Sequence, residues 1–269
     1  MKIVVVGGCH IANYGIPSSE GFLQQWTSYL SAVYGETVQI TCFAQIAYHQ
    51  LPTLVEQHHT TFQEADLILL QMGNYELSYK GAFWDLFVKA GLPGISLEPS
   101  PSSLTTSTMP TILTQFRDVG VYNYPRHWLD WLKNRVKITT LSFYQLMGGR
   151  IAILKRLTQS MSQANEWLRP FASKIVMLTP FPSLNAVDHW LRVASKPLFQ
   201  REAKRHGFTL LDVSQAVPLR QSYFLADKYH LNQRGHIEMA HCLMKSLSVA
   251  GTGGRHRRQS RRSSLGTLT

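Results

Sequence analysis

The chain has 269 residues, of which 44% are apolar, and carries a formal net charge of +11 at pH 7. That length and apolar content are enough to bury the full core of one domain. Its three cysteines lie far apart, which excludes a disulfide framework and a CxxC metal site and favours a reduced, cytoplasmic protein.

The positive charge is concentrated near the end of the sequence. Residues 251–269 hold five arginines and no acid, so +6 (11 − 5) remains for the rest of the chain. This segment consists almost entirely of Gly, Ser, Thr and Arg, and we predict a disordered basic tail. A loose contact of the tail with phosphates or an anionic membrane is the alternative to a solvated end. No specific nucleic-acid partner is therefore expected, and no stretch approaches the ~18 apolar residues of a membrane span.

Short apolar strands alternate with amphipathic helices along the chain. The first apolar run is too short for a signal peptide and is typical of a buried strand. Strands are predicted at 2–6, 37–42, 66–71, 174–178 and 208–213, and helices at 21–34, 52–60, after 183, and at 233–247. On the helix at 21–34, five apolar residues share one face: Phe22, Trp26, Tyr29, Leu30 and Val33. This alternation predicts an α/β domain over residues 1–250, with a mostly parallel five-stranded sheet and helices on both faces.

The stretch from about 79 to 169 fits this alternation least, and we interpret it as a mostly helical insertion. Residues 91–110 form a Pro/Ser/Thr-rich loop, and residues 145–168 have a helical pattern. Trp128, Trp131, Tyr122 and Tyr124 lie among basic residues. The insertion is either a lid or acceptor-binding surface, or a packed helical appendage that hides its tryptophans.

Two distant segments carry residues suited to acyl chemistry. Asp227 precedes His230 by three residues on a loop that enters a helix, so the carboxylate can hold one ring nitrogen while the other accepts a proton. The first strand ends at Gly7-Gly8-Cys9, a tight turn that exposes the next side chain at the carboxyl edge of a parallel sheet. Cys9 is therefore the candidate nucleophile.

These residues resemble the motifs of the SGNH (GDSL-type) hydrolases, a family of esterases, lipases and carbohydrate deacetylases. Gly7-Gly8-Cys9 matches the first block, and Asp227 to His236 matches the last block closely. Gly73-Asn74-Tyr75-Glu76 matches the third block with one residue fewer, while the stretch 41–45 lacks the glycine of the second block. The resemblance implies a three-layer α/β/α flavodoxin-like sandwich. It also implies an oxyanion hole built from the Cys9 amide, an amide near Ala44 and the Asn74 side chain beside Gly73.

Three functions remain open for this set of residues. The first is hydrolysis of an acyl ester or thioester, with a small-molecule or carbohydrate acyl substrate, through Cys9, His230 and Asp227. The second is acyl transfer by the same residues, since a thioester on Cys9 passes its acyl group readily to an amine or alcohol. The third is a catalytically silent binding or scaffold protein in which Cys9 is a small buried hydrophobe.

Other patterns in the sequence predict no cofactor and no metal. No Gly-x-Gly-x-x-Gly follows the first strand, and the histidines near residue 58 lack zinc-helix spacing. Asp188 and His189 are expected on a polar helix surface, and His10 is expected either to contact substrate or to be exposed on a turn. The oligomeric state is not readable from the sequence.

Overall fold

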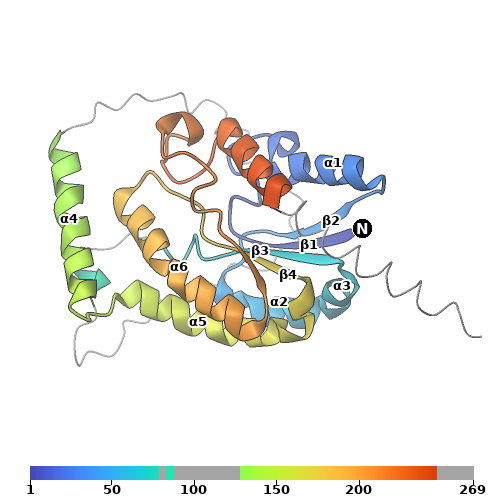
Figure 1. Ribbon diagram of the computed structural model, residues 1–269, viewed down its shortest axis with the longest axis horizontal. Coiled ribbons are helices and arrows are strands. Elements are labelled where there is room, and N and C mark those ends of the chain that lie inside the picture. Colours follow the sequence, from blue (N-terminus) through green and yellow to red (C-terminus); the bar gives the residue numbers. More distant parts are fainter. Residues whose placement is uncertain (79–82, 88–127, 247–269) are drawn as a thin grey trace, which may run out of the picture.

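The computed structural model describes residues 1–78, 83–87 and 128–246. A five-stranded sheet with the strand order β2-β1-β3-β4-β5 forms its centre, and all four strand pairs are parallel (Figure 1). The strands are β1 (Lys2–Gly7), β2 (Gln39–Phe43), β3 (Leu67–Gln71), β4 (Ile175–Leu178) and β5 (Thr209–Leu211). This order is that of flavodoxin-like sheets, and the predicted fold class is confirmed.

Seven α-helices are described around the sheet. They are α1 (Phe22–Tyr34), α2 (Leu51–Gln57), α3 (His59–Glu64), α4 (Trp128–Leu146), α5 (Ala152–Leu168), α6 (Ala186–His206) and a last helix over 233–246. Short 3₁₀ segments are η1 (Ser18–Glu20), η2 (Tyr48–Gln50), η3 (Phe83–Leu86), η5 (Arg169–Lys174) and η6 (Gln221–Tyr223). None of the helices in the described ranges is both long and apolar enough to cross a bilayer.

The alternation of side chains along β1 divides the interior into two cores. Val4 and Val6 face a core that α2, α3, α5 and α6 cover, whereas Ile3 and Val5 face a second core covered by α1 and the helix over 233–246. Because both faces of the sheet are buried at its centre, β1, β3 and β4 are continuous apolar runs rather than alternating ones, whereas the edge strand β2 is largely exposed.

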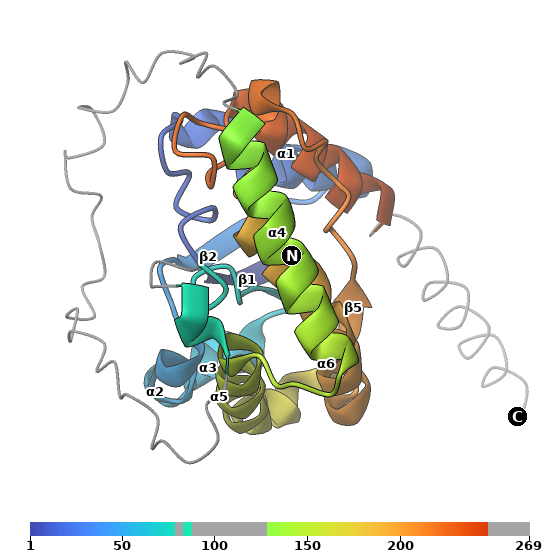
Figure 2. The same ribbon diagram turned by 90° about the vertical axis from the view of Figure 1, so that its left-hand side faces the viewer.

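All five strands run toward the same side of the molecule. β1 starts beside the N-terminus at the right of Figure 1, so the carboxyl edge of the sheet faces left, where α4 stands. Turned by 90°, the molecule shows α4 in front of the sheet (Figure 2). Any side chain that follows a strand therefore lies at the end of the molecule that α4 flanks.

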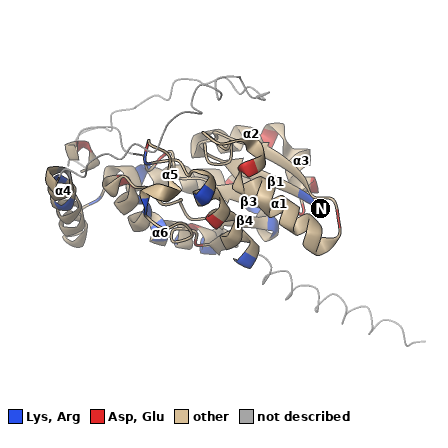
Figure 3. Ribbon diagram, turned by 90° about the horizontal axis from the view of Figure 1, so that it is seen from above, with Lys and Arg blue, Asp and Glu red and all other residues tan. Residues whose placement is uncertain are grey.

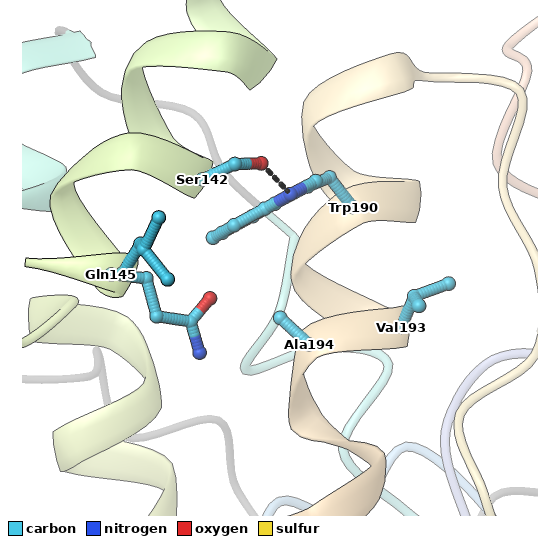
Figure 4. A pocket seen from close by; sticks show the side chains of 6 residues that line it. Ser142, Gln145, Trp190, Val193 and Ala194 are labelled. Atoms are coloured by element: carbon cyan, nitrogen blue, oxygen red, sulfur yellow. Dashed lines mark hydrogen bonds between the residues drawn. The ribbon is translucent and has the colours of Figure 1, made fainter.

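The segment predicted as an insertion contains two different helices. α5 buries one face in the core beneath the sheet, with Leu157, Met161 and Leu168 almost fully covered. α4 contacts α6 through Ser142, whose hydroxyl oxygen accepts a hydrogen bond of 3.0 Å from the Trp190 indole, and α4 also buries Leu141 in the core. An open groove of about 360 Å³ lies between the two helices (Figure 4).

Some sequence predictions of the elements were wrong in detail. The helical pattern over 145–168 is not one helix, because Gly148 adopts a φ of +77° and separates α4 from α5. Val33 was expected on the buried face of α1 but is exposed. The predicted loop at 91–110, Tyr122, Tyr124 and the basic tail lie outside the described residues.

Candidate active site

Cys9, His230 and Asp227 form a continuous hydrogen-bonded row at the carboxyl edge of the sheet. The Cys9 Sγ lies 2.8 Å from the His230 Nε2, and the His230 Nδ1 lies 2.5 Å from the Asp227 Oδ2. The two halves of this row are 221 residues apart in sequence. A nucleophile, a base and a carboxylate that orients the base are the three groups that acyl transfer to a side chain requires.

The loop that carries His230 is held by the same carboxylate that orients its ring. The other oxygen of Asp227, Oδ1, accepts hydrogen bonds from the backbone N–H groups of Tyr229 and His230, at 2.9 and 3.0 Å. Lys228, between Asp227 and Tyr229, adopts a φ of +66°, which turns the chain back toward Asp227. Asp227 therefore fixes both the backbone and the imidazole of this loop.

The ionisation of His230 reflects these contacts. Burial disfavours the charged ring, but hydrogen bonds to Asp227 and Cys9 and the charges of both groups outweigh it and raise the pKa of His230 to about 9. Burial also acts on Asp227, whose pKa is nevertheless lowered by its hydrogen bonds to the ring and the loop. These contacts therefore favour an ionised carboxylate and the protonated form of the imidazole.

His10 lies beside the same sulfur and is buried, so its expected exposure on a turn was wrong. Its Nε2 lies 3.2 Å from the Tyr229 carbonyl oxygen, which only accepts, so Nε2 carries the proton. The unprotonated Nδ1 then accepts from the Asn74 Nδ2 at 3.3 Å and faces the Cys9 Sγ at 3.9 Å. Burial, followed by the neighbouring His230 and Arg192 charges, lowers the pKa of His10 well below its ordinary value.

Asn74, a predicted oxyanion donor, is buried and anchored at both ends of its amide. Its Oδ1 accepts a hydrogen bond of 2.9 Å from the Phe181 backbone N–H, and its Nδ2 is directed at His10. Gly73 before it has a φ of +91°, and a Cβ at this position would lie 2.7 Å from the Phe199 ring. Gly73 is therefore needed for the turn that brings Asn74 to the Cys9 side of the sheet.

The loop after β2 contains Ala44, the other predicted oxyanion residue. Ala44 is half-buried and packs on the core beneath α1. Gln45 after it adopts a φ of +60°, and the Ile46 N–H donates a 3.0 Å hydrogen bond to the Gly7 carbonyl oxygen. The loop thus makes a left-handed turn at Gln45 without a glycine, and it is tied to the end of β1.

No family model matches the chain, and no curated protein does. Solved structures do. A lipase from a goat rumen metagenome superposes with a TM-score of 0.53 at 13% identity, covering 90% of this chain and 95% of that one. A lipase/acylhydrolase from Enterococcus faecalis has a TM-score of 0.53 at 13% identity, over 91% and 94%. An acetylxylan esterase from Geobacillus stearothermophilus has a TM-score of 0.52 at 12% identity, over 91% and 92%.

The chain has the SGNH hydrolase fold. Within that fold, His236 of the last block stabilises the start of α1. Its Nδ1 accepts a 3.1 Å hydrogen bond from the Phe22 N–H, which lies in the first turn of α1, where backbone N–H groups have no acceptor within the helix. Burial, with a contribution from the His230 charge, lowers the pKa of His236 to about 4, so the ring is neutral and able to accept.

A buried cation behind the site was missed by the sequence reasoning. Arg192 is 3% exposed, and its Nη1 donates to the Phe181 and Pro182 carbonyl oxygens at 2.8 and 2.9 Å. Burial lowers its pKa to about 10, against the opposing charges of Asp188, Cys9 and Tyr229. The expectation that Asp188 lies on a polar surface was wrong, because its side chain is fully buried. The i, i+4 spacing of Asp188 and Arg192 was the available signal.

Proposed function

We propose that this chain is an SGNH-type acyl hydrolase that cleaves an acyl ester or thioester through Cys9, His230 and Asp227. The observation that carries the proposal is the 2.8 Å contact of the Cys9 sulfur with a histidine whose far nitrogen is held by a carboxylate. An imidazolium at that distance favours a thiolate nucleophile, which needs less base assistance than a hydroxyl. Lipases and esterases among the structures of the same fold make acyl esters the substrate class to test first.

In the first half of the reaction, the Cys9 sulfur forms a bond to the acyl carbon. The bond from that carbon to the leaving oxygen or sulfur breaks, and the His230 Nε2 gives its proton to the leaving group. In the second half, water attacks the thioester while His230 takes a proton from it. The carbon–sulfur bond then breaks, which releases the acid and restores the starting pair.

The developing negative charge on the acyl oxygen needs hydrogen-bond donors. We assign the Cys9 backbone N–H, an N–H of the loop at Ala44, and the Asn74 Nδ2 to this role. Asn74 has two N–H bonds on Nδ2, of which one is directed at His10, so the oxyanion would take the other. His10 is a positioning residue in this proposal, since it holds Asn74 from one side and the Tyr229 carbonyl from the other.

Intact-mass analysis after incubation with p-nitrophenyl acetate tests the proposal. We expect a single acetyl adduct that Cys9→Ala abolishes and that Cys242→Ala, a matched replacement on the last helix, leaves in place. Cys242 is half-buried, and burial raises the pKa of its thiol, so it should react slowly. An adduct that survives Cys9→Ala would place the chemistry elsewhere, and the absence of both an adduct and p-nitrophenol release would favour the silent scaffold.

Acyl transfer is the second candidate, and the thiol nucleophile favours it because a thioester reacts with amines and alcohols more readily than an ester does. Adding glycerol or an amino sugar to the p-nitrophenyl acetate assay separates the two. A hydrolase releases acetate in proportion to p-nitrophenol, whereas a transferase forms acetylated acceptor at the expense of acetate. Cys9→Ser is expected to lose most transfer while it keeps slow hydrolysis.

A further inference from the structure

The outward side of α4 exposes a row of large apolar side chains, which we call the α4 stripe. Val136 is 59% exposed and Phe143 62% exposed, and neither is covered by another element of the described chain. The stripe consists of Trp128, Leu129, Leu132, Val136 and Phe143. Single exposed apolar residues are ordinary on a protein surface, but several on one side of a 19-residue helix are not.

Helical spacing puts these residues on one side and the contacts with the body on another. Leu129, Leu132 and Val136 follow one another at i, i+3 and i+7, and Phe143 continues the row two turns later. The side of α4 turned to the body instead carries buried Leu141 and Ser142, which is hydrogen-bonded to Trp190 (Figure 4). The described parts of the chain therefore pack on one side of α4 and leave the stripe exposed.

Cations border the α4 stripe. Lys133 and Arg135 fall on opposite sides of it, and Lys137 lies further round, while Asp130 is the one acid in the helix sequence. The Arg135 guanidinium sits 5.2 Å from the Trp131 ring centre, which keeps that charge next to an exposed indole. Figure 3 shows α4 at the end of the molecule with basic residues on it. An apolar face with Trp, Leu and Phe and a basic border is typical of a helix that lies in a membrane interface.

We infer that the α4 stripe docks on the surface of a lipid bilayer that contains anionic lipid. The net charge favours a membrane over a second copy of the chain as the partner of the stripe. Two chains of charge +11 repel each other, whereas an anionic leaflet attracts both the basic border and the chain as a whole. Thr139 and Thr140 also interrupt the row at its middle, which weakens a helix–helix seam but is tolerated at an interface.

The position of α4 gives this docking a direction. The carboxyl ends of the strands point to the side of the molecule that α4 flanks (Figures 1 and 2). A chain seated through the stripe thus brings the end that carries Cys9 toward the lipid surface. Docking needs no chemistry at Cys9, so it stands or fails independently of the proposed hydrolase activity.

Co-sedimentation of the full chain with vesicles tests the inference. Vesicles of phosphatidylcholine with phosphatidylglycerol should pellet the protein at low salt, and vesicles of phosphatidylcholine alone should pellet much less. The double variant Leu132→Glu/Val136→Glu should bind at least about tenfold more weakly, since it places two carboxylates in the apolar face and beside the lipid phosphates. Lys133→Gln and Arg135→Gln should each weaken binding to the anionic vesicles by about fivefold.

Leu219→Glu is the matched control, because Leu219 is a similarly exposed leucine outside α4, and it should bind like the original chain. Circular dichroism and melting curves check that each variant is folded, and the two glutamine variants carry the test if the double variant is not. Failure of the original chain to pellet with anionic vesicles overturns the inference. So does unchanged binding of the double variant, which would assign binding to another basic segment. A dimer in size exclusion that the double variant dissociates would instead make a second copy the occupant.

Discussion

The carboxyl edge of the sheet and the outward side of α4 depart in opposite ways from the usual distribution of polar and apolar residues. At the sheet edge, polar groups are buried, and Asn74, His10 and Arg192 each form hydrogen bonds within the chain. On α4, apolar groups are exposed and the cations lie beside them. Burying polar groups or exposing apolar ones costs stability in either place, unless a partner compensates. The partners of the first region lie within the chain, and those of the second lie outside it.

The largest effect on activity is expected from a substitution in the row of Cys9, His230 and Asp227. Asp227→Asn should lower hydrolysis by roughly 10²–10⁴-fold, because the asparagine can neither hold the His230 tautomer nor stabilise its charge. Loss of the carboxylate should also lower the pKa of His230 from about 9 toward its ordinary 6.5, which an NMR titration of the imidazole measures. Unchanged activity and an unchanged titration would mean that Asp227 is only a loop residue.

The same pair makes stability depend on pH in a defined window. The folded pKa of His230 is raised, so its contribution to the free energy of unfolding is complete below pH 6.5 and is lost as the pH rises through about 9. The folded pKa of Asp227 is lowered, so its contribution is present above the ordinary 3.8 and is lost as the pH falls through the folded value. The stability difference between the original chain and Asp227→Asn should therefore be greatest between those two ordinary values.

A smaller effect tests whether the buried polar groups of the sheet edge depend on one another. Asn74→Ala removes the acceptor of the Phe181 N–H and a donor to His10, and we expect a loss of about 1–3 kcal/mol in the free energy of unfolding. Tyr75→Ala, at the exposed neighbouring position, should change it by less than about 0.5 kcal/mol. Urea unfolding measures both, and equal effects would show that the network around Asn74 contributes nothing.

Gln45 offers a milder test of the loop beside the site. Gln45→Gly should stabilise the chain by up to about 1 kcal/mol, because glycine adopts the left-handed conformation without the penalty of a Cβ. Gln63→Gly, the same replacement on an exposed position of α3, should instead cost roughly 0.5–1 kcal/mol. Destabilisation at both positions would mean that the Gln45 side chain makes a contribution larger than the backbone strain.

The smallest effect is expected on α4. Because the fold leaves the stripe exposed, Leu132→Glu/Val136→Glu should change the free energy of unfolding by less than about 0.5 kcal/mol at each position. Leu141→Ala on the buried side of the same helix should cost about 2–5 kcal/mol. Thermal melts of both variants give the comparison, and a large loss from the glutamates would show that the stripe is packed in solution.

The sequence predicted the sheet and the elements that place Cys9 and His230, because strand periodicity and glycine turns are local signals. The burial of His10 and Asp188 was not predictable in this way, since it depends on which distant parts of the chain pack over these side chains. The backbone conformation of Gln45 was not predictable either. Local propensity favours glycine in the left-handed region, and the tertiary contacts of the loop override that preference here. Which way Trp128 and Trp131 point depends on the side of α4 that meets α6.

The separation of Cys9 from His230 along the chain has a consequence for synthesis. At a translation rate of 5–20 residues per second, the ribosome adds the intervening 221 residues in roughly ten to forty seconds. During that interval, the growing polypeptide contains the first strand and the Cys9 thiol without the imidazole that contacts this thiol in the folded chain. A nascent chain or a fragment cut before residue 227 therefore carries Cys9 without His230, and on the proposed function it should react slowly until the segment around His230 docks against the loop after β1.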